Sequence, residues 1–316
     1  MEFLEIKQLK KYFPTPKGML HAVDDVTLSI SCGKTLGVVG ESGCGKSTLG
    51  KAILQLERAT AGEIWFDGGE ISRLSKKKYK PYRTRLQMIF QDPYASLDPR
   101  MSIMKLLSEP LDTYKLTKTK DETQRRVYDL MEVVGLNARY AHSYPHELDG
   151  GRRQRIGIAR ALSLEPEFIV CDEPVSALDV SIQAQILNLL KQLQKDKNLT
   201  YMFITHDLSV VRHISDDICV MYLGRVVEKC ASKELFRNTI HPYTRALLSA
   251  VPVPSLHNRR ERKILMGELA SPVDPKPQCR FAPRCEFASE ECFASEPDLM
   301  DIGGDHFVAC HKFGQV

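Results

Sequence analysis

Nine consecutive residues combine glycines, a lysine and hydroxyl groups in a spacing suited to holding phosphate. They match the pattern G-x-x-x-x-G-K-[ST] and are Gly40, Glu41, Ser42, Gly43, Cys44, Gly45, Lys46, Ser47 and Thr48. Glycines let backbone N–H groups approach phosphate oxygens, and a helix N-terminus adds the positive end of its dipole. We predict that Lys46 pairs with the β- and γ-phosphates of ATP and that Ser47 binds Mg²⁺.

Two further sets of polar residues follow apolar runs typical of buried strands. Phe168 to Cys171 leads into Asp172 and Glu173, and Tyr201 to Thr205 leads into His206. Parallel sheets bind ligands at the carboxyl ends of their strands, so we expect these residues near the phosphates. Asp172 is then suited to the Mg²⁺ shell, Glu173 to polarising the attacking water, and His206 to contacting the γ-phosphate. A structural role for His206 is the alternative.

The surrounding sequence predicts the elements that position these residues. Residues 35–39 form a buried-strand pattern before the glycine-rich segment, and Leu49, Ile53 and Leu56 recur behind it at helical spacing. Residues 1–95 have the short strands and turns of a β-rich region, and residues 100–165 have helical spacing. Residues 166–235 alternate strand and helix, which indicates a parallel sheet with crossover helices. From about residue 236, frequent prolines predict a linker and an irregular appendage.

Composition narrows the class of protein. The 316 residues are 43% hydrophobic and carry a net charge of +4, which does not favour nucleic-acid binding. No apolar run reaches the 18 or so residues of a membrane-spanning helix, and the N-terminus lacks the core of a signal peptide. We therefore expect a cytosolic chain whose contact with any membrane runs through a partner.

The nine cysteines are unevenly distributed. Four of them fall near the C-terminus, at Cys279, Cys285, Cys292 and Cys310. In a reducing compartment, clustered thiols favour metal binding over disulfides. Four thiolates suit either zinc or a [4Fe–4S] cluster, and the loops between them are wider than zinc-ribbon C-x-x-C pairs. Unliganded thiols are the third interpretation.

Together these motifs resemble the ABC ATPase family. Seven motifs occur in the family's order between residues 12 and 206. Besides the phosphate loop, Asp172, Glu173 and His206, Gln91 resembles the Q-loop glutamine, which in the family also approaches Mg²⁺. Asp179 resembles the D-loop aspartate. The segment at the position of the family's L-S-G-G-Q signature is Leu148, Asp149, Gly150, Gly151 and Arg152.

A narrower resemblance is to the ATPase subunits of oligopeptide and dipeptide importers. It is carried by Lys11–Pro14, Gln91–Leu97, His241–Thr244 and the C-terminal cysteines. Within the first segment, Phe13 is the first choice for stacking on adenine and Tyr12 the second, with core packing as the alternative for both. The residues around the cysteines also resemble these importers, and the resemblance favours [4Fe–4S] over zinc.

The resemblance implies a P-loop α/β fold with an antiparallel β subdomain, a helical subdomain and a small Cys-rich appendage. We expect the ATPase domain over residues 1–235, its helical subdomain over about 95–165, and the extension over 236–316. Implied partners are a homologous ATPase subunit, two integral membrane permeases and an extracytoplasmic substrate-binding protein. The chain would lie at the cytoplasmic face of the membrane, hydrolyse ATP and drive import. The segment from Tyr94 to Arg100 and the helical region to about 145 would contact a permease.

The signature departs from the family pattern at two positions, with Asp149 for Ser and Arg152 for Gln. An aspartate there brings like charge near a γ-phosphate, at a cost of about 4 kcal/mol at 4 Å and an effective dielectric constant near 20. Arg152 or Arg153 could neutralise it. Because the signature acts on the partner's nucleotide, we hypothesise a heterodimer with one altered site. Tolerance of either residue is the alternative.

Two other classes of protein compete with this interpretation. An ABC ATPase acting on DNA or ribosomes is disfavoured by the single cassette and by the absence of a heptad run or basic patch. A subunit that binds ATP without hydrolysing it is disfavoured because both Glu173 and His206 are present.

Overall fold

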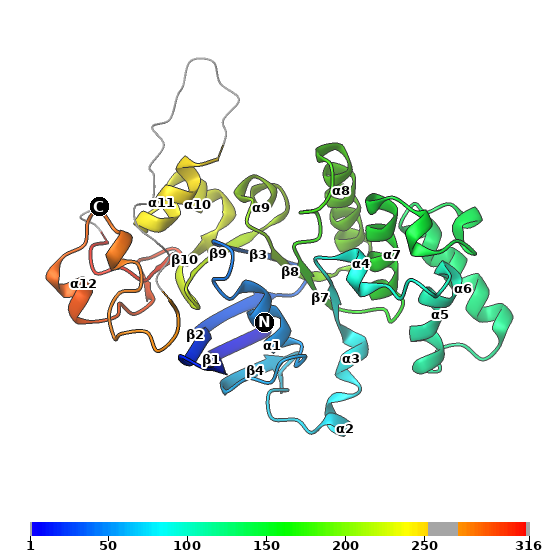
Figure 1. Ribbon diagram of the computed structural model, residues 1–316, viewed down its shortest axis with the longest axis horizontal. Coiled ribbons are helices and arrows are strands. Elements are labelled where there is room, and N and C mark those ends of the chain that lie inside the picture. Colours follow the sequence, from blue (N-terminus) through cyan, green and yellow to red (C-terminus); the bar gives the residue numbers. More distant parts are fainter. Residues whose placement is uncertain (1, 252–270, 314–316) are drawn as a thin grey trace, which may run out of the picture. The chain divides into compact units, whose positions relative to one another are not determined.

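The computed structural model describes residues 2–251 and 271–313 (Figure 1). They divide into two compact units, the first comprising Met1–Leu74 and Phe203–Val316 and the second Ser75–Met202. Part of the predicted proline-rich linker, residues 252–270, lies outside the described residues. The predicted domain limits at 235 and at about 95–165 stay predictions.

The helices and strands follow the expected order of β-rich, helical and alternating regions. The strands are β1 (Glu2–Thr15), β2 (Gly18–Ser31), β3 (Thr35–Val39), β4 (Ala61–Phe66), β5 (Gly69–Glu70), β6 (Leu86–Ile89), β7 (Phe168–Asp172), β8 (Thr200–Ile204), β9 (Asp217–Tyr222), β10 (Arg225–Ala231), β11 (Met300–Asp301) and β12 (Phe307–Val308). The helices are α1 (Lys46–Ile53), α2 (Lys76–Tyr79), α3 (Tyr82–Arg85), α4 (Pro93–Ser96), α5 (Ile103–Thr113), α6 (Lys120–Val133), α7 (Gly150–Leu162), α8 (Val180–Lys197), α9 (Leu208–Ile214), α10 (Ser232–Arg237), α11 (Pro242–Ser249) and α12 (Glu290–Ala294).

An antiparallel sheet with the order β2-β1-β4-β5 forms the N-terminal part of the first unit (Figure 1). Leu4, Ile6 and Leu9 on β1 are at most 1% exposed, because one face of the sheet packs inward while charged residues occupy the other. The sequence predicts short strands over residues 1–95, whereas β1 and β2 are continuous strands of 14 residues each. The pairing of β1 with β2 shifts register at several points, and both strands continue through these β-bulges or irregularities.

The second sheet of the first unit leads directly to the phosphate loop. Its strands run in the order β11-β12-β10-β9-β3, with β3 parallel to β9 and the other pairs antiparallel. Every residue of β3 is buried, as expected for a strand that is covered on both faces. Gly37 lets α9 approach β3, since a Cβ there would lie 2.5 Å from Val211 Cγ1. The glycine-rich segment begins where β3 ends.

The second unit contains the helical region and the strands β6 and β7, which pair in parallel. Helices α5, α6 and α7 pack against one another and lie side by side in Figure 1. Their apolar residues Leu107, Val127 and Ile156 are fully buried. Across residues 2–251 and 271–313, no helix combines the length and the apolar character needed to cross a membrane.

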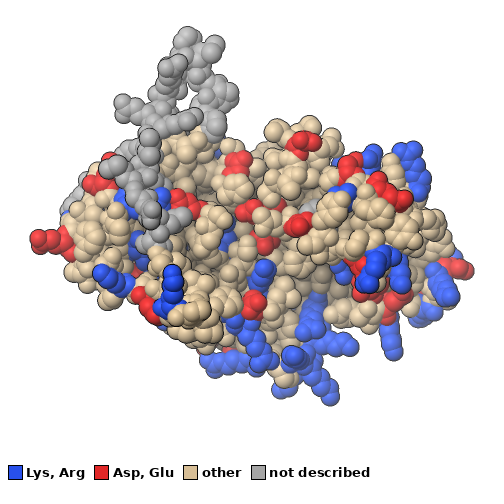
Figure 2. All heavy atoms as spheres, viewed as in Figure 1, with Lys and Arg blue, Asp and Glu red and all other residues tan. Residues whose placement is uncertain are grey.

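Lys and Arg side chains gather over α2 and α3 of the second unit, as Figure 2 shows. The exposed residues of this small basic surface are Lys76, Lys77, Lys78, Lys80 and Arg83. The expectation that the chain has no basic patch is therefore too simple for this segment, although the run is short. Short charged runs are commonly solvated, and the chain as a whole carries both signs of charge.

The C-terminal segment is attached to the first unit through a buried carboxylate. Glu228 on β10 is 0% exposed and accepts hydrogen bonds from the backbone N–H groups of Ile240 (2.8 Å) and His241 (3.2 Å). It also contacts His306 Nε2 at 2.9 Å, and β12 pairs with β10 at the same residue. A buried carboxylate requires such partners, so the C-terminal residues complete the structure around β10.

Candidate functional site

The phosphate loop curls around the ammonium group of Lys46. This side chain is 4% exposed, and its Nζ donates to the carbonyl oxygens of Gly40 (2.8 Å) and Glu41 (2.9 Å). Lys46 is also the first residue of α1, so the loop ends at a helix N-terminus. The loop, the cation and the helix end predicted to bind phosphate therefore lie together, and they offer complementary charge to an anion.

Two glycines of the loop have conformations and surroundings that exclude a side chain. Gly45 has φ 103°, and a Cβ there would lie 2.0 Å from the carbonyl oxygen of Ala22. Gly40 has φ 152°, and its Cβ would lie 2.2 Å from the carbonyl oxygen of Met221. Both obstacles are backbone atoms that cannot move aside easily. The loop thus depends on glycine for close packing against neighbouring strands as well as for its dihedral angles.

The protein engages the backbone N–H, the carbonyl oxygen and the carboxylate of Glu41. Its N–H donates to Tyr243 Oη at 2.8 Å, and its carbonyl accepts from Lys46. Its carboxylate forms a two-point ion pair with Arg284, with contacts of 2.8 Å and 3.1 Å. This bond to Glu41 is the main cause that raises the pKa of Arg284, so the arginine stays charged. Glu41 stays a predicted nucleotide contact, although its N–H already has a partner.

The two aromatic residues predicted near adenine have different environments. Tyr12 stacks on His21 with ring centroids 3.9 Å apart and donates its phenol hydrogen to Asp24. Because side chains alternate along a strand, Phe13 lies on the opposite face of β1, where Lys11 Nζ lies 4.4 Å from its ring centroid. The ring and the hydroxyl group of Tyr12 are thus already engaged by His21 and Asp24. This arrangement favours Phe13 over Tyr12 for stacking on adenine.

Asp24 is the centre of the network that holds Tyr12. It accepts hydrogen bonds from Tyr12 and Arg280 and contacts His21 Nδ1 at 3.0 Å. Burial by itself would raise the pKa of Asp24, but the hydrogen bonds and the Arg280 charge outweigh it and hold the pKa well below its usual range. Asp24 is therefore ionised at neutral pH and keeps its pairing with Arg280.

His206 follows β8 in the first unit and is exposed. The residue before it, Thr205, donates its N–H to the carbonyl oxygen of Val38 at 3.1 Å, and Val38 lies on β3 just before the phosphate loop. The residue after it, Asp207, caps α9 by accepting from Ser209 N–H at 2.7 Å. The backbone on both sides of His206 is thus fixed beside the strand that leads into the loop.

In the second unit, the structure brings together two predicted catalytic side chains. Gln91 Nε2 donates to Glu173 Oε2 at 3.0 Å, although the two are 82 residues apart in the sequence. Glu173 has φ 44°, a left-handed conformation uncommon for a residue with a side chain and frequent at functional sites. Asp172, the last residue of β7, is 4% exposed. The carboxyl end of β7 therefore presents both predicted carboxylates, as expected.

The unusual signature residues interact with each other. Asp149 caps α7 by accepting from Arg152 N–H at 2.8 Å, and the Arg152 guanidinium forms an ion pair with the same carboxylate. Arg153 instead donates to the carbonyl oxygen of Pro145 at 2.6 Å. Of the two arginines considered for neutralising Asp149, Arg152 is the one that pairs with it. The pair is exposed, so its contribution to stability is small.

The signature glycines also permit close helix packing within the second unit. A Cβ on Gly151 would lie 2.7 Å from Ile182 Cγ2, and one on Gly150 would lie 3.2 Å from Leu178 Cδ2. The start of α7 is thereby held against the segment containing Asp179, the N-cap residue of α8. The next residue, Val180, is 82% exposed. Val180 is therefore an apolar side chain that the described residues leave largely uncovered.

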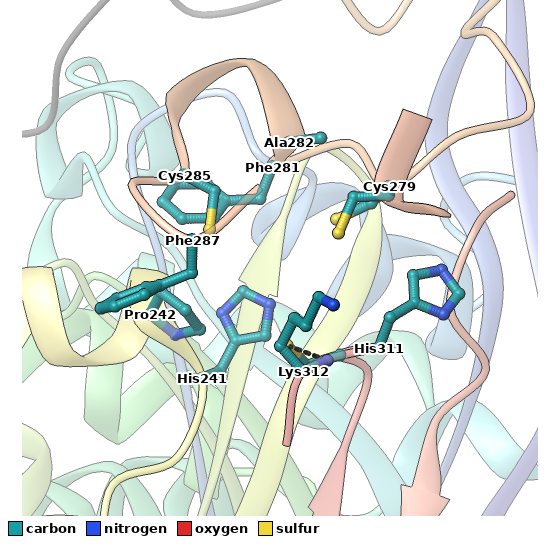
Figure 3. Close-up of a pocket in the computed structure, with 11 residues that line it drawn as sticks. His241, Pro242, Cys279, Phe281, Ala282, Cys285, Phe287, His311 and Lys312 are labelled. Atoms are coloured by element: carbon teal, nitrogen blue, oxygen red, sulfur yellow. Dashed lines mark hydrogen bonds between the residues drawn. The ribbon is translucent and has the colours of Figure 1, made fainter. Parts of the chain in front are cut away.

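The four C-terminal cysteines line one pocket of the first unit. Figure 3 shows the sulfur atoms of Cys279 and Cys285 pointing into it, and Cys292 and Cys310 also line it. Burial raises the pKa of Cys279 to about 11, and it also raises the pKa values of Cys285 and Cys310. The thiols of Cys279, Cys285 and Cys310 are therefore protonated at neutral pH unless a metal displaces their protons.

The pocket contains four thiols, which are suitable ligands for a sulfur-ligated metal centre. The present positions of these side chains do not by themselves support such a centre. Its walls are largely apolar, with Phe281 and Phe287 among them, and its cavity volume is about 10 Å³. Within the described ranges, no three His, Cys, Asp or Glu side chains are arranged to hold a metal ion as they stand. Four thiols in one apolar pocket nevertheless suit a soft metal centre, provided that the side chains rearrange.

Sequence reasoning missed the residues that support the nucleotide site from behind. Arg284 and Tyr243 contact Glu41 in the phosphate loop from distant segments. Asp24 accepts a hydrogen bond from Tyr12, and Arg280 pairs with Asp24. The sequence points to Arg280 and Arg284 only through the resemblance of the residues around the cysteines to peptide importers. Their contacts with Asp24 and Glu41, 256 and 243 residues away, have no local pattern that could predict them.

Comparison with known proteins places the chain in a family. Residues 23–176 match the family model described as ABC transporter, and residues 227–292 match the oligopeptide/dipeptide transporter C-terminal region. The putative oligopeptide transport ATP-binding protein YkfD of Bacillus subtilis is 52% identical over 316 residues, covering 99% of this chain and 96% of YkfD. The oligopeptide transport ATP-binding protein OppF of Escherichia coli is 50% identical, covering 98% of this chain and 92% of OppF.

Solved structures agree with this assignment. A dimeric post-hydrolysis state of the ATP-binding cassette MJ0796 bound to ADP and Pi matches with a TM-score of 0.67 and 28% identity, covering 72% of this chain and 98% of that one. CbiO1 from Clostridium perfringens, part of the transporter complex CbiONQ, matches with a TM-score of 0.66 and 28% identity, covering 75% of this chain and 91% of that one. The fold and the phosphate loop thus define an ABC-type ATPase.

Within that class, the chain belongs to the ATP-binding proteins of the oligopeptide/dipeptide transporter family. The predictions of the family, of the α/β ABC ATPase fold and of ATPase activity are confirmed. The roles of individual site residues stay predictions.

The packing of the phosphate loop predicts different effects for two glycine substitutions. Gly45→Ala adds a Cβ against the backbone of Ala22 and imposes a left-handed conformation on alanine. Gly43→Ala imposes similar strain, about 1–2 kcal/mol, but its Cβ meets no atom within 4 Å. We expect Gly45→Ala to weaken MgATP binding at least about tenfold and Gly43→Ala to weaken it much less. Equilibrium titration with a fluorescent ATP analogue measures both, and equal affinities for the two variants would contradict the packing argument.

Proposed function

We propose that this chain binds and hydrolyses ATP to drive the import of oligopeptides or dipeptides through an ABC transporter. The observation that carries the proposal is the buried ammonium of Lys46, enclosed by the phosphate-loop carbonyls at the end of β3 and the start of α1. A triphosphate replaces those carbonyls as the partner of the cation and gains a charge-assisted contact. The full-length similarity to oligopeptide transport ATP-binding proteins supports the peptide cargo.

The residue roles we propose follow from the chemistry of each side chain. Ser47, Gln91 and Asp172 supply oxygens for Mg²⁺, a hard cation that favours such ligands. Glu173 polarises the attacking water, and its hydrogen bond to Gln91 links the predicted base to a proposed Mg²⁺ ligand. His206 contacts the γ-phosphate, and Phe13 stacks on adenine.

The proposed assembly contains a homologous ATPase subunit, two membrane permeases and an extracytoplasmic substrate-binding protein. One of the similar cassette structures is described as dimeric and bound to ADP and Pi, which supports a pair of ATPase subunits. Val180 is a candidate for their interface. Phe90 and Tyr94 are 42% and 54% exposed, which supports a permease-binding surface in the second unit. The chain then lies at the cytoplasmic face of the membrane as a peripheral subunit and does not bind nucleic acid.

Substitutions at two residues separate nucleotide binding from hydrolysis in the reconstituted transporter. We expect Lys46→Ala to weaken MgATP affinity about ten- to hundredfold, because it removes hydrogen bonds to a charged group. We expect Glu173→Gln to retain affinity and to lower the turnover number about 10²- to 10⁴-fold, because it removes a general base. Equilibrium binding and phosphate release measure the two effects, and uptake of a labelled oligopeptide measures the coupled transport.

The same preparation tests the cargo. Oligopeptide should stimulate ATP hydrolysis and accumulate inside the vesicles. Stimulation by nickel chelates or sugars without any response to peptides would disprove the peptide assignment and leave the ATPase assignment intact. Unchanged affinity and uptake in Lys46→Ala would disprove the nucleotide site itself.

We further propose that the chain pairs with a different ATPase subunit and that the two nucleotide sites are unequal. Asp149 and Arg152 replace the family's Ser and Gln in the signature, while Lys46, Glu173 and His206 match the family pattern. The Asp149–Arg152 ion pair offsets much of the aspartate's charge but occupies the group that would otherwise face a γ-phosphate. The altered signature acts on the partner's nucleotide, so the site containing this chain's own phosphate loop is the fully active one.

Changing Asp149 to Ser in the assembled transporter tests the inequality of the sites. We expect the Asp149→Ser variant to hydrolyse ATP faster at the partner's phosphate loop, because the repulsion near that γ-phosphate disappears. The rate is measured with Glu173→Gln also present, so that the remaining turnover comes from the partner's loop. Equal rates with and without the Asp149→Ser substitution would show that the signature tolerates both residue types.

For the extension over residues 236–316, which follows the ATPase domain proposed for residues 1–235, we propose a [4Fe–4S] cluster held by Cys279, Cys285, Cys292 and Cys310. The support is the common pocket of the four thiols and the match of residues 227–292 to the transporter C-terminal region. The thiols would deprotonate on binding iron, and the cluster would stabilise a segment with few core residues of its own.

Metal analysis of an anaerobic preparation tests the cluster. We expect a brown protein with stoichiometric iron and acid-labile sulfide, and we expect Cys285→Ser to lose both. Cys32→Ser is the matched control, because Cys32 is exposed and does not line the pocket. Stoichiometric zinc, or wild-type protein without metal, would exclude the cluster in favour of a zinc site or of unliganded thiols.

A further inference from the structure

Two buried arginines lie within the short C-terminal segment 279–285. Arg280 precedes Phe281, Arg284 is the last residue of the single turn Ala282–Arg284, and their side chains are only 6% and 7% exposed. They reach different parts of the first unit, Arg280 contacting Asp24 on β2 and Arg284 contacting Glu41 in the phosphate loop. Buried arginines require partners, so the conformation of this segment and that of its two targets depend on each other.

Arg284 forms an ion pair with the one carboxylate of the phosphate loop, that of Glu41. The guanidinium meets both oxygens of the Glu41 carboxylate, at 2.8 Å and 3.1 Å. The Glu41 carboxylate belongs to the loop that receives the triphosphate, so without Arg284 it would present an unneutralised negative charge to that ligand. The loop backbone is also fixed at this point, because Glu41 N–H donates to Tyr243 at 2.8 Å.

Aromatic packing holds the arginine segment in place against the same part of the structure. The ring of Phe281 lies 5.3 Å from that of Tyr222 and 5.4 Å from that of Tyr243, centroid to centroid. Tyr222 and Tyr243 are themselves 4.7 Å apart and are 0% exposed. Three rings in mutual contact form a stiff support, so the position of Arg284 is transmitted to the loop with little freedom.

Arg280 acts at the part of the predicted nucleotide site that would bind adenine, whereas Arg284 acts at the phosphate loop. Arg280 pairs with Asp24, which in turn accepts the phenol hydrogen of Tyr12. Arg280 also donates to Glu296 at 3.0 Å and to the carbonyl oxygen of Leu223, so its guanidinium is fixed on several sides. Anchoring the phenol of Tyr12 sets the orientation of β1 at its neighbour Phe13, which faces the opposite side of the strand.

We infer that Arg280 and Arg284 are positioning residues through which the C-terminal cysteine-bearing segment sets the affinity of the nucleotide site. Arg284 neutralises and orients the phosphate loop through Glu41, and Arg280 orients the adenine-stacking strand through Asp24 and Tyr12. This inference rests on the proposed assignment of the phosphate loop and Phe13. It adds a role for the C-terminal segment, which supports ATP binding without touching the nucleotide.

Binding of two probes to the full-length chain separates the two roles. The probes are MgATP and magnesium tripolyphosphate, which lacks adenine. We expect Arg284→Gln to weaken both probes at least about tenfold. The double variant Glu41→Gln with Arg284→Gln should recover most of that loss, because it removes the unneutralised carboxylate. We expect Arg280→Gln to weaken MgATP by a similar factor and to leave tripolyphosphate binding within about twofold of wild type.

Two matched variants separate positioning from loss of fold. Arg237→Gln changes an exposed arginine at the end of α10 and should bind both probes as wild type does. Asp24→Asn with Arg280→Gln removes both members of the buried pair, so it avoids leaving an unpaired charge and should keep the wild-type melting temperature. This double variant should nevertheless bind MgATP more weakly than wild type, because the contacts that anchor Tyr12 are altered.

The outcomes distinguish this inference from the proposed function. Wild-type affinity for both probes in Arg284→Gln and Arg280→Gln, together with lost affinity in Lys46→Ala, would overturn the inference and retain the nucleotide site. Failure of Lys46→Ala to weaken either probe would overturn the proposed site itself. If Arg284→Gln lowers affinity and melting temperature together and Glu41→Gln restores neither, Arg284 has only a structural role and the inference is wrong.

Discussion

The burial of one positive charge inside a tightly curled loop is the constraint on which the first unit depends. Lys46 is almost fully enclosed, and its ammonium is satisfied by loop carbonyls. Such a loop must turn sharply and lie against backbone atoms of Ala22 and Met221, which only glycine permits at positions 45 and 40. The strand before the loop and the helix after it then hold its two ends. The cation and the helix N-terminus together offer a concentrated positive region to a triphosphate.

A loop arranged to bind anions tolerates a nearby carboxylate only if that carboxylate is neutralised. Glu41 is such a residue, and a C-terminal arginine supplies the compensating charge in a two-point contact. The same logic applies to Asp24, whose charge is balanced by Arg280, and to Asp149, whose charge is offset by Arg152. In the first two cases the pair is largely buried, so separating the partners is costly. In the third the pair is exposed, so a ligand can rearrange it at little cost.

The C-terminal segment contributes to the first unit in two ways. Through Glu228, His306 and the β10–β12 pairing it adds to the sheet that contains the phosphate-loop strand β3. Through Arg280 and Arg284 it reaches the surroundings of the nucleotide site. Its cysteines line a pocket next to the same aromatic residues, since Phe281 is shared by the pocket and the cluster of Tyr222 and Tyr243. A change in how the thiols are liganded would therefore act on residues that already contact the arginine segment.

The sequence alone determined the family, the phosphate loop, the strand ends that carry Asp172 and Glu173, and the order of β-rich, helical and alternating regions. These features are local, because glycine spacing, apolar runs and helical periodicity express backbone requirements over a few residues. Only the tertiary structure decided that β2 is continuous, that Arg152 pairs with Asp149 when Arg153 was equally available, and that Tyr12 is committed to Asp24. It also decided that the arginines at 280 and 284 meet carboxylates more than 200 residues away. Such pairings depend on which surfaces come together as the apolar core forms. The sequence around an ionic side chain contains no pattern from which its distant partner could be predicted.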